Sequence, residues 1–171
     1  MAMDELSLKE AVIEAANLLV KRGVVSLSRH GNFSVRIPNT DTVLLTATSS
    51  FDNLGPENLA LLDLEGRLLA GEIDPTSAEI IHMHAVVYKH RPEVGAVVHT
   101  HSPFATGFAL AGRPIECSYE ALVRFDMTDG VPLARYGPRG SPEAVRNIAD
   151  ALTGAREIKA VLLENHGVLA F

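Results

Sequence analysis

The sequence predicts a single mixed α/β domain, and three observations support this prediction. The chain has 171 residues, of which 47% are hydrophobic, which is enough for one sizeable core. Short apolar runs rich in β-branched residues, typical of strands, recur along the chain. Between them lie amphipathic segments that begin with helix-capping residues. We therefore expect one domain of strands and helices over residues 1–171.

Charge and cysteine content narrow the classes of partner and compartment. The formal net charge is −6, with acidic and basic residues interspersed, which disfavours a nucleic-acid partner. No apolar run approaches the roughly 20 residues that span a bilayer, so we expect no membrane partner. The single cysteine, Cys117, excludes an internal disulfide framework. Together with an N-terminus unlike a signal peptide, it favours a cytoplasmic protein.

The first part of the chain predicts a helix followed by strands. Ser7 and Glu10 have capping-box spacing, so we expect a helix from Ser7 to about Gly23. Gly31 and Asn32 form a turn signal, and residues 33–37 then alternate like a strand. The other strand candidates in this part are residues 42–46, 59–64 and 67–70.

Two loops in this part have more than one interpretation. Gly31 and Asn32 either enter a plain hairpin or cradle an anion, and the local sequence favours the hairpin. The hydroxyl-rich loop that contains Thr48 turns the chain or binds an oxyanion, and locally the turn is favoured. Arg29 is either a solvated surface charge or a bidentate partner for a carboxylate or phosphate.

The second helix is predicted to start at Asp74 and to have its body over residues 80–90. Thr76 and Glu79 have capping-box spacing, so Glu79 is either an ordinary helix start or an acid/base group. His82 and His84 lie about 200° apart around a helix and cannot both serve one metal. We expect His84 to pack or form hydrogen bonds, and His82 to be partly solvated.

The later elements are predicted from caps, breakers and apolar runs. Proline at the first helical position and glycine after the last turn are the usual signals. Residues 115–129 remain ambiguous and receive no element. The predicted elements are a helix over residues 102–112 that Gly112 ends, a short edge strand over residues 131–134, a helix from Ser141 to about Leu152, and a strand over residues 159–163.

The stretch over residues 94–102 is the part around which the chain is organised. Its valine-rich run predicts a buried strand that ends in His-Thr-His, so His99 and His101 point to the same side. His166 follows another apolar run, residues 160–163. Three neutral imidazoles with an open fourth position are typical of a catalytic zinc site. On these residues alone, buried structural histidines are an equally good interpretation.

These motifs together resemble the class II aldolase/adducin-head family, in particular its fuculose-phosphate aldolase-like members. Residues 91–106, which include His99 and His101, resemble the central signature of that family. Asn165-His166-Gly167 resembles its late zinc-ligand motif. Residues 31–36 are similar to its early anion-binding turn, and residues 46–48 to the following loop. The order and spacing of the motifs match from about residue 7 to residue 171.

The resemblance implies an architecture and an assembly. The fold would be a three-layer α/β/α domain around a mostly antiparallel central sheet. The protein would form a homotetramer, with its sites near subunit interfaces. Because family members continue further and the sequence ends within a strand-like run at Phe171, we also expect a C-terminal piece beyond this residue.

The resemblance also implies a zinc-dependent lyase with a small-molecule substrate. The expected reaction is reversible aldol cleavage of a small hydroxy-carbonyl compound, sugar phosphates included, through a metal-stabilised enediolate. His99, His101 and His166 would hold Zn²⁺ or another divalent metal, and Glu79 would be the acid/base residue. The implied phosphate-binding positions are Gly31, Asn32, Thr48 and Ser77, to which residue chemistry adds Arg29 as a substrate-binding candidate.

Three departures from the family pattern bear on the substrate. Arg29 and His30 stand where phosphate-binding members carry small hydroxyl residues, and Ser49 stands where they carry glycine. The segment before Glu79 is also altered, with one extra residue between Glu79 and His84. These changes weigh against a sugar phosphate more than against the metal. The alternatives are an epimerase, dehydratase or decarboxylase on the same site, or a non-catalytic adducin-like interaction module.

Overall fold

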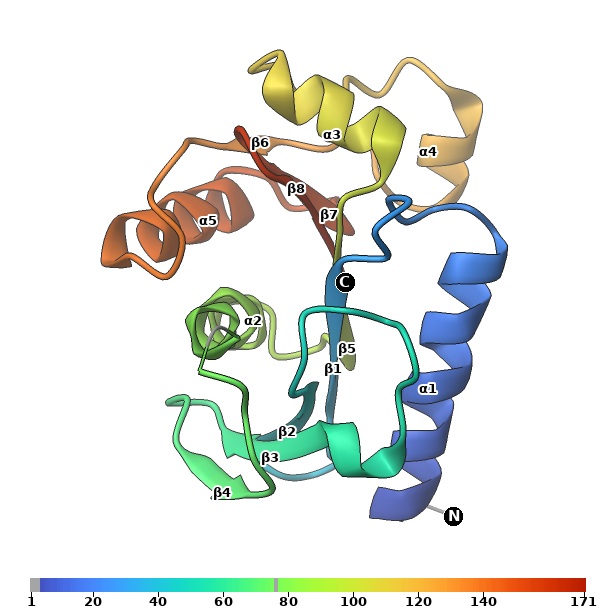
Figure 1. The fold of residues 1–171 in the computed structure, drawn as a ribbon. Coiled ribbons are helices and arrows are strands. Elements are labelled where there is room, and N and C mark those ends of the chain that lie inside the picture. Colours follow the sequence, from blue (N-terminus) through green and yellow to red (C-terminus); the bar gives the residue numbers. More distant parts are fainter. Residues whose placement is uncertain (1–3, 76) are drawn as a thin grey trace.

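The computed structural model describes residues 4–75 and 77–171, so the capping-box interpretation of Thr76 lies outside the described residues. Figure 1 shows a central sheet with helices on both faces. The strands are β1 (Gly31–Arg36), β2 (Thr42–Thr46), β3 (Leu59–Asp63), β4 (Leu68–Ala70), β5 (Ala96–Thr100), β6 (Leu133–Ala134), β7 (Ala160–Leu163) and β8 (Gly167–Ala170). The helices are α1 (Glu5–Lys21), α2 (Ile81–His90), α3 (Pro103–Leu110), α4 (Glu120–Arg124) and α5 (Pro142–Gly154), with short 3₁₀ turns η1 (Pro56–Asn58) and η2 (Ala78–Ile80).

The eight strands form one sheet in the order β4-β3-β2-β1-β5-β8-β7-β6. Every neighbouring pair is antiparallel except β6 and β7, which run parallel. The sheet is therefore mostly antiparallel, as predicted. The two-residue strand β6 lies at one edge, where the proline before it removes a donor that a central strand would need.

The strands divide their side chains between two helical layers, because successive residues of a strand point to opposite faces. In β2, Val43 and Leu45 belong to the core under α2 and α5, whereas Leu44 packs with side chains of α1. In β7, Leu162 packs instead with Ala109 of α3. Figure 1 shows α2 and α5 on one face and α1 and α3 on the other. The arrangement is the predicted three-layer α/β/α domain.

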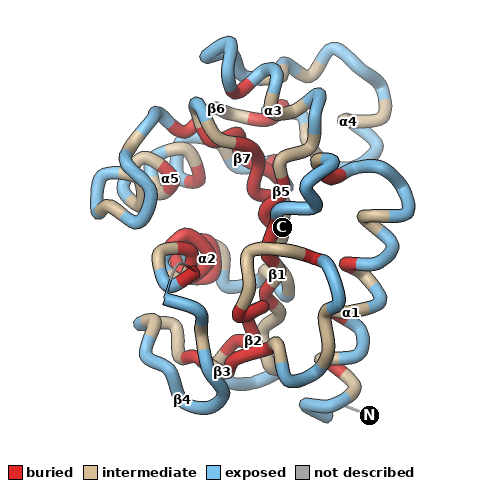
Figure 2. Tube along the Cα trace, viewed as in Figure 1, coloured by how far each residue is buried: buried red, intermediate tan, exposed pale blue. Residues whose placement is uncertain are grey.

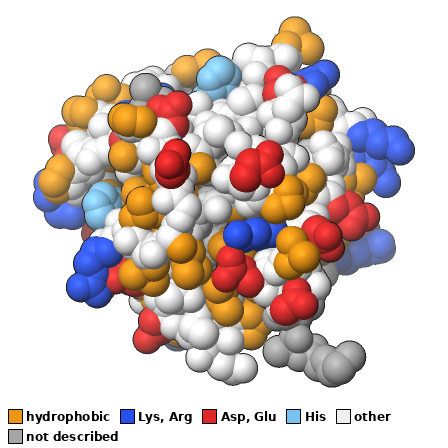
Figure 3. Space-filling view, turned by 60° about the horizontal axis from the view of Figure 1, so that its bottom comes forward, with side chains coloured by type: hydrophobic (Ala, Val, Ile, Leu, Met, Phe, Trp, Pro, Cys, Tyr) orange, Lys and Arg blue, Asp and Glu red, His pale blue; other side chains and the backbone are white. Residues whose placement is uncertain are grey.

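Burial follows these layers. The most buried residues run along the central strands and through α2, which lies beside α5 in the same helical layer, as Figure 2 shows. On the face drawn in Figure 3, basic and acidic side chains of the described residues are interspersed among hydrophobic ones. Within residues 4–75 and 77–171, none of the helices combines the length and apolarity needed to cross a bilayer.

The first helix starts earlier than predicted. α1 begins at Glu5, and the Asp4 carboxylate caps it by accepting a hydrogen bond of 2.8 Å from the Ser7 backbone N–H. The predicted capping box at Ser7 and Glu10 is therefore wrong, since Ser7 is a donor to the cap and already lies in the first turn. An aspartate three residues upstream takes the capping role, so the helix starts about one turn earlier.

The predicted turn at Gly31 and Asn32 is also wrong, because both residues belong to β1. They pair with Thr100 and His99 of β5. A Cβ on Gly31 would lie 2.7 Å from the His99 carbonyl oxygen, so glycine is needed for close approach of two strands. A glycine selected for that contact gives the same local sequence signal as a turn.

Two later segments also differ from the expectation. The helix proper begins at Ile81, and the preceding residues form the 3₁₀ turn η2. The unassigned residues 115–129 contain α4. The caps of the last helices are as predicted: Ser141 accepts a hydrogen bond from the Ala144 N–H at the start of α5, and Gly112, with φ +65°, follows the end of α3.

Candidate metal and catalytic site

Several strand ends meet at one end of the sheet. β1 starts there beside the end of β5, since Gly31 pairs with Thr100. Thr100 also pairs with Val168 at the start of β8, which follows the end of β7. Because β2 is antiparallel to β1, it ends there as well. The topology thus gathers at this end most of the site residues that the sequence predicts: Gly31, Asn32, Thr48, His99, His101 and His166.

Three of these residues form a histidine cluster. Each of His99, His101 and His166 offers one ring nitrogen, and the three nitrogens lie within 4.8 Å of one another. The Nε2 atoms of His99 and His101 are 3.1 Å apart. The predicted shared face of the His-Thr-His segment is confirmed, and the third histidine joins it from the β7–β8 hairpin. Among the described residues this set is able to hold a metal ion.

The orientation of His99 is fixed by the backbone of β8. Its Nδ1 donates a hydrogen bond of 3.0 Å to the Val168 carbonyl oxygen. A neutral imidazole carries one hydrogen, so Nε2 keeps its lone pair and accepts from His101 Nε2. A carbonyl partner of this kind is the usual support behind a metal-binding histidine. A cation would take the place of the hydrogen now shared between the two rings.

The hairpin that carries His166 depends on two residues with special backbone roles. Leu163 pairs with Gly167 across a loop in which Asn165 has φ +60°. Asparagine adopts this left-handed conformation more readily than most residues. A Cβ on Gly167 would lie 2.6 Å from the Thr100 carbonyl oxygen and 3.0 Å from the His101 ring. The Asn-His-Gly motif therefore shapes the turn and makes room for the cluster.

Burial keeps the three imidazoles neutral. It lowers the pKa of His99 well below its ordinary value, and the neighbouring His166 and His101 add to this effect. Burial, then His101 and the Arg139 guanidinium, lower the pKa of His166 to about 4. Burial, His30 and Arg139 lower the pKa of His101. Neutral imidazole is the form that ligates metals, so this donor set fits a divalent cation.

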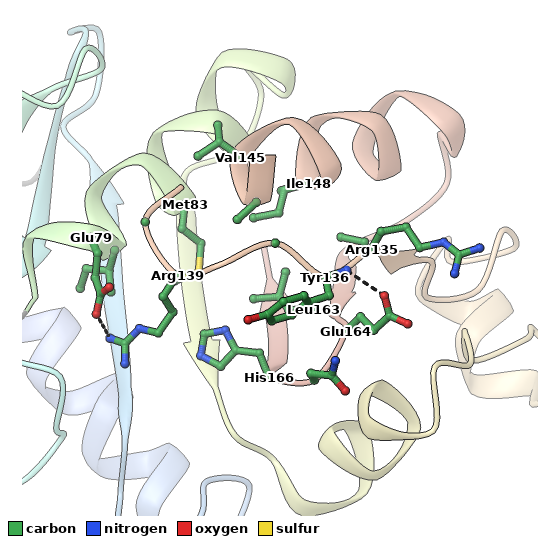
Figure 4. A pocket seen from close by; sticks show the side chains of 16 residues that line it. Glu79, Met83, Arg135, Tyr136, Arg139, Val145, Ile148, Leu163, Glu164 and His166 are labelled. Carbon is green, nitrogen blue, oxygen red and sulfur yellow. Dashed lines mark hydrogen bonds and ion pairs between the residues drawn. The ribbon is translucent and has the colours of Figure 1, made fainter. Parts of the chain in front are cut away.

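Glu79 lies on the same side of the sheet as the three histidines, but the residue that pairs with it was not predicted. Its Oε1 atom is 2.5 Å from Nη2 of Arg139, in the segment between β6 and α5. The Glu79 side chain is 34% exposed and that of Arg139 54% exposed. Figure 4 shows the two side chains meeting beside His166. The Glu79 carboxylate therefore lies at the mouth of the site, where it is held by the positively charged guanidinium of Arg139.

These residues line a cavity of about 330 Å³. Its floor is apolar and comes from α2, α5 and β7, whereas its rim is polar, as Figure 4 shows. A small concave site with few polar groups is typical of a small-molecule pocket. The apolar lining includes Met83, Val145, Ile148 and Leu163, and the polar lining includes Glu79, Arg135, Arg139, Glu164 and His166.

Asn32 is held by a chain of buried hydrogen bonds. Its Oδ1 accepts from His84 Nε2 at 2.5 Å, and His84 Nδ1 accepts from the Ser34 hydroxyl at 2.7 Å. Ser34 in turn accepts from Tyr88 at 2.8 Å. His84 thus forms hydrogen bonds, as predicted, whereas His82 is exposed. With Oδ1 occupied, the Asn32 amide nitrogen remains as a donor for a ligand.

The other predicted substrate-binding residues have different surroundings. The Ser77 hydroxyl is buried and has no hydrogen-bond partner among the described residues, which is unusual for a buried polar group. The Thr48 hydroxyl donates to the Ser50 carbonyl oxygen at 3.1 Å. Arg29 forms an ion pair of 2.5 Å with Asp52. The structure therefore gives Arg29 a protein partner in place of a free guanidinium.

Arg139 is the site residue that sequence reasoning missed. A faint signal was present, since Gly137-Pro138-Arg139-Gly140 is a turn sequence directly before the capped start of α5. Nothing local connects that turn to Glu79, because the contact joins segments far apart in the chain.

Known proteins resemble this chain in sequence and in fold. The family model for the class II aldolase and adducin N-terminal domain matches residues 10–171. A 5-methylthioribulose-1-phosphate/5-deoxyribulose-1-phosphate aldolase of Escherichia coli O45:K1 is 32% identical over 170 residues, which cover 98% of this chain and 75% of the relative. A 3-oxo-tetronate 4-phosphate decarboxylase of Haemophilus influenzae is 34% identical over 176 residues, covering 98% and 78%. Among solved structures, an L-fuculose 1-phosphate aldolase superposes with a TM-score of 0.83 at 27% identity, covering 99% of this chain and 76% of the other.

Proposed function

This chain belongs to the class II aldolase and adducin N-terminal domain family, and we propose that it is a zinc-dependent lyase for a small hydroxy-carbonyl substrate. Relatives similar to nearly all of this chain are named as aldolases and a decarboxylase, so the chain is an enzyme of this family. The proposed reaction is reversible aldol cleavage of a carbon–carbon bond next to a carbonyl group. The observation that carries the proposal is the convergence of three neutral histidines beside a carboxylate-bearing cavity.

His99, His101 and His166 would hold the cation. When bound, a divalent metal supplies Lewis-acid stabilisation of the negative charge that develops on the substrate oxygens. The chain itself fixes the ligand orientation through the Val168 carbonyl and keeps the imidazoles neutral through burial. Both features favour metal binding before any substrate arrives.

Glu79 is the proposed acid/base residue. Its carboxylate lies at the rim of the cavity that His166 also lines, where it would take a proton from the substrate in one direction and return it in the other. The apolar floor of the cavity, with Met83 and Ile148, would exclude water from the reacting atoms.

The substrate's anionic group has candidate partners on the β1–β2 side of the histidines. The Asn32 amide lies at the start of β1 beside Gly31, whose own N–H donates to the Ser49 carbonyl oxygen at 3.0 Å. The unpaired Ser77 hydroxyl supports a ligand there, since Asp74 N–H bonds to the Ala47 carbonyl and ties this segment to the end of β2. Thr48 and Arg29 complete the proposed substrate-binding set, although Arg29 would first have to leave Asp52.

We extend the proposal to assembly and location. Large apolar side chains are exposed on α3 and α4, which follow the His-Thr-His segment, and they support a homotetramer with sites near subunit contacts. Light scattering on the purified protein would test this, with four chains of 18.4 kDa as the expected mass. The unpaired Cys117 supports the cytoplasm. The exposed apolar side chains are Phe104 and Phe108 of α3, Val123 of α4 and Phe125, which directly follows α4.

The activity test pairs the wild type with Glu79→Gln. Zinc-loaded protein is offered lactaldehyde with dihydroxyacetone phosphate, and lactaldehyde with pyruvate, and new carbon–carbon products are measured. The variant should keep its metal and lose about 10²–10⁴-fold in turnover, the usual contribution of a positioned acid/base group. Full turnover in the variant would remove Glu79 from the mechanism. Release of CO₂ from a 3-keto acid without aldol products would favour the decarboxylase alternative.

A further inference from the structure

The turn that carries Arg139 is fixed on both sides. The Ser141 N–H bonds to the Pro138 carbonyl at 2.9 Å, and Gly140 has φ +71° inside this turn. A Cβ on Gly137 would lie 2.5 Å from the Ala144 nitrogen, so the turn is seated against the start of α5. A Cβ on Gly140 would lie 2.7 Å from Glu79 Cβ. The Arg139 backbone is therefore held against the residue with which its side chain pairs.

The ion pair between Arg139 and Glu79 is one that another anion can replace. The two side chains are 54% and 34% exposed, and their atoms meet at the cavity rim (Figure 4). Exposed ion pairs add little net stability, because both groups are well solvated when apart. A guanidinium has two parallel N–H donors for a carboxylate. The carboxylate of an incoming acid can therefore pair with Arg139 as Glu79 does.

The charges around the cavity also favour an anion. Arg139 is close enough to His101 and His166 to lower the pKa of both, so its charge reaches the metal side. Arg135 lines the same cavity. Of the two acidic residues in the lining, Glu164 already accepts a hydrogen bond of 2.7 Å from the Tyr136 N–H. Glu79 is then the carboxylate that an acidic ligand would replace.

Resting on the proposed function, we propose that Arg139 binds a carboxylate of the substrate and that this carboxylate displaces Glu79. The substrate class is then a small hydroxy-carbonyl acid, with its acid group on the β6–α5 side of the histidines. The residues proposed for a second anionic group lie on the opposite, β1–β2 side. Acid binding frees Glu79 at the moment it is needed, so a neutral compound of the same size leaves Glu79 paired.

The test measures binding and needs neither metal nor turnover. Metal-free protein is titrated with glycerate, and with glycerol as the neutral control, by calorimetry or NMR. Arg139→Ala should weaken glycerate binding by about tenfold or more, the difference that a lost charge-assisted contact makes. Arg139→Lys should recover part of the loss. Arg146→Ala removes an exposed arginine of α5 outside the cavity lining and should bind like the wild type.

A double-mutant cycle tests the displacement itself. Glu79→Gln should tighten glycerate binding by about threefold or more, because the competing carboxylate is gone. The same substitution in the Arg139→Ala background should bring no gain. A gain that persists there would mean simple repulsion by Glu79, which overturns the displacement.

Other outcomes would overturn the acid assignment. Glycerate binding that does not depend on Arg139, or that is missing in the wild type, would remove the proposed subsite. If glycerol 3-phosphate depends on Arg139 and glycerate does not, the group at this position is a phosphate and the carboxylate assignment is wrong. Metal content and carbon–carbon cleavage do not enter these measurements, so the proposed function can fail or stand separately.

Discussion

His84 and His99 are both buried histidines whose pKa values are lowered by burial, but their ring nitrogens meet different partners. His84 uses both nitrogens inside the protein, one toward Ser34 and one toward Asn32. His99 uses one nitrogen to bond the Val168 carbonyl, and the other faces two further histidines. The first arrangement satisfies a core residue, and the second leaves a lone pair for a ligand.

The comparison shows that burial and a lowered pKa do not identify a metal ligand. Burial lowers the pKa of His84 to about 3 and that of His99 well below its usual range, yet these values give no role. What separates the two is the partner of the second nitrogen: that of His84 meets the Asn32 carboxamide, whereas that of His99 meets the ring nitrogen of another histidine in a cluster of three. The structural network also serves the site, since His84 orients the amide of Asn32.

The largest expected effect concerns metal-linked stability. Adding zinc to metal-free wild-type protein should raise the free energy of unfolding by about 4 kcal/mol when free zinc is 1,000 times its dissociation constant. His166→Ala should show almost none of this gain, and His84→Gln should show most of it. Denaturant unfolding with and without zinc gives the numbers. Equal stabilisation of wild type and His166→Ala by zinc would contradict the distinction between the hydrogen-bonded core histidine and the histidines of the metal cluster.

The next effect separates His84 from an exposed neighbour. His84→Ala leaves the Ser34 hydroxyl and the Asn32 carboxamide without their partner in a site that is 1% exposed. The free energy of unfolding should fall by about 3 kcal/mol, in line with the loss of a buried hydrogen-bond network. His82→Ala, two residues away and exposed, should change it by less than about 0.5 kcal/mol. Similar small losses in both variants would show that the network adds little.

A third effect appears as a pH dependence of the metal-free protein. Because the pKa of His84 falls from 6.5 in the unfolded chain to about 3 in the folded protein, the unfolded state takes up a proton first as the pH drops. The contribution of neutral His84 to the free energy of unfolding is present above pH 6.5 and is lost as the pH falls below that value. His84 alone should cost about 2 kcal/mol between pH 7 and pH 5. The His84→Gln variant should lose that much less over this interval, and parallel pH profiles would contradict the assignment.

The smallest effect concerns the hairpin turn that carries His166. Asn165 has φ +60°, where alanine is strained and glycine is not. Asn165→Ala should lower the free energy of unfolding by about 1 kcal/mol and weaken zinc binding, whereas Asn165→Gly should keep both near the wild type. Thermal unfolding and a zinc titration measure the two changes. An alanine variant as stable as the glycine variant would show that the turn does not depend on this conformation.

The sequence was sufficient to predict those features that follow from the local periodicity of side chains. Alternation along β5 placed His99 and His101 on one side, and the apolar run before His166 placed the third histidine at a strand end. The mixed fold and most element positions follow from the same patterns.

The remaining features depend on contacts between distant segments. Gly31 is a glycine because β1 approaches β5 closely, which a single segment cannot reveal. Arg139 meets Glu79 only because the turn before α5 folds onto η2. The cap of α1 was missed for a local reason, since Asp4 and Ser7 compete for the same role and only the backbone geometry decides.

The most direct test of the metal site is the metal content of purified, tag-free protein after exposure to zinc, measured for wild type, His101→Ala and His84→Gln. The geometry predicts about one zinc per chain in the wild type and in His84→Gln, and none in His101→Ala. Equal zinc in His101→Ala and wild type, or no metal in any of the three, would contradict a metal centre at His99, His101 and His166.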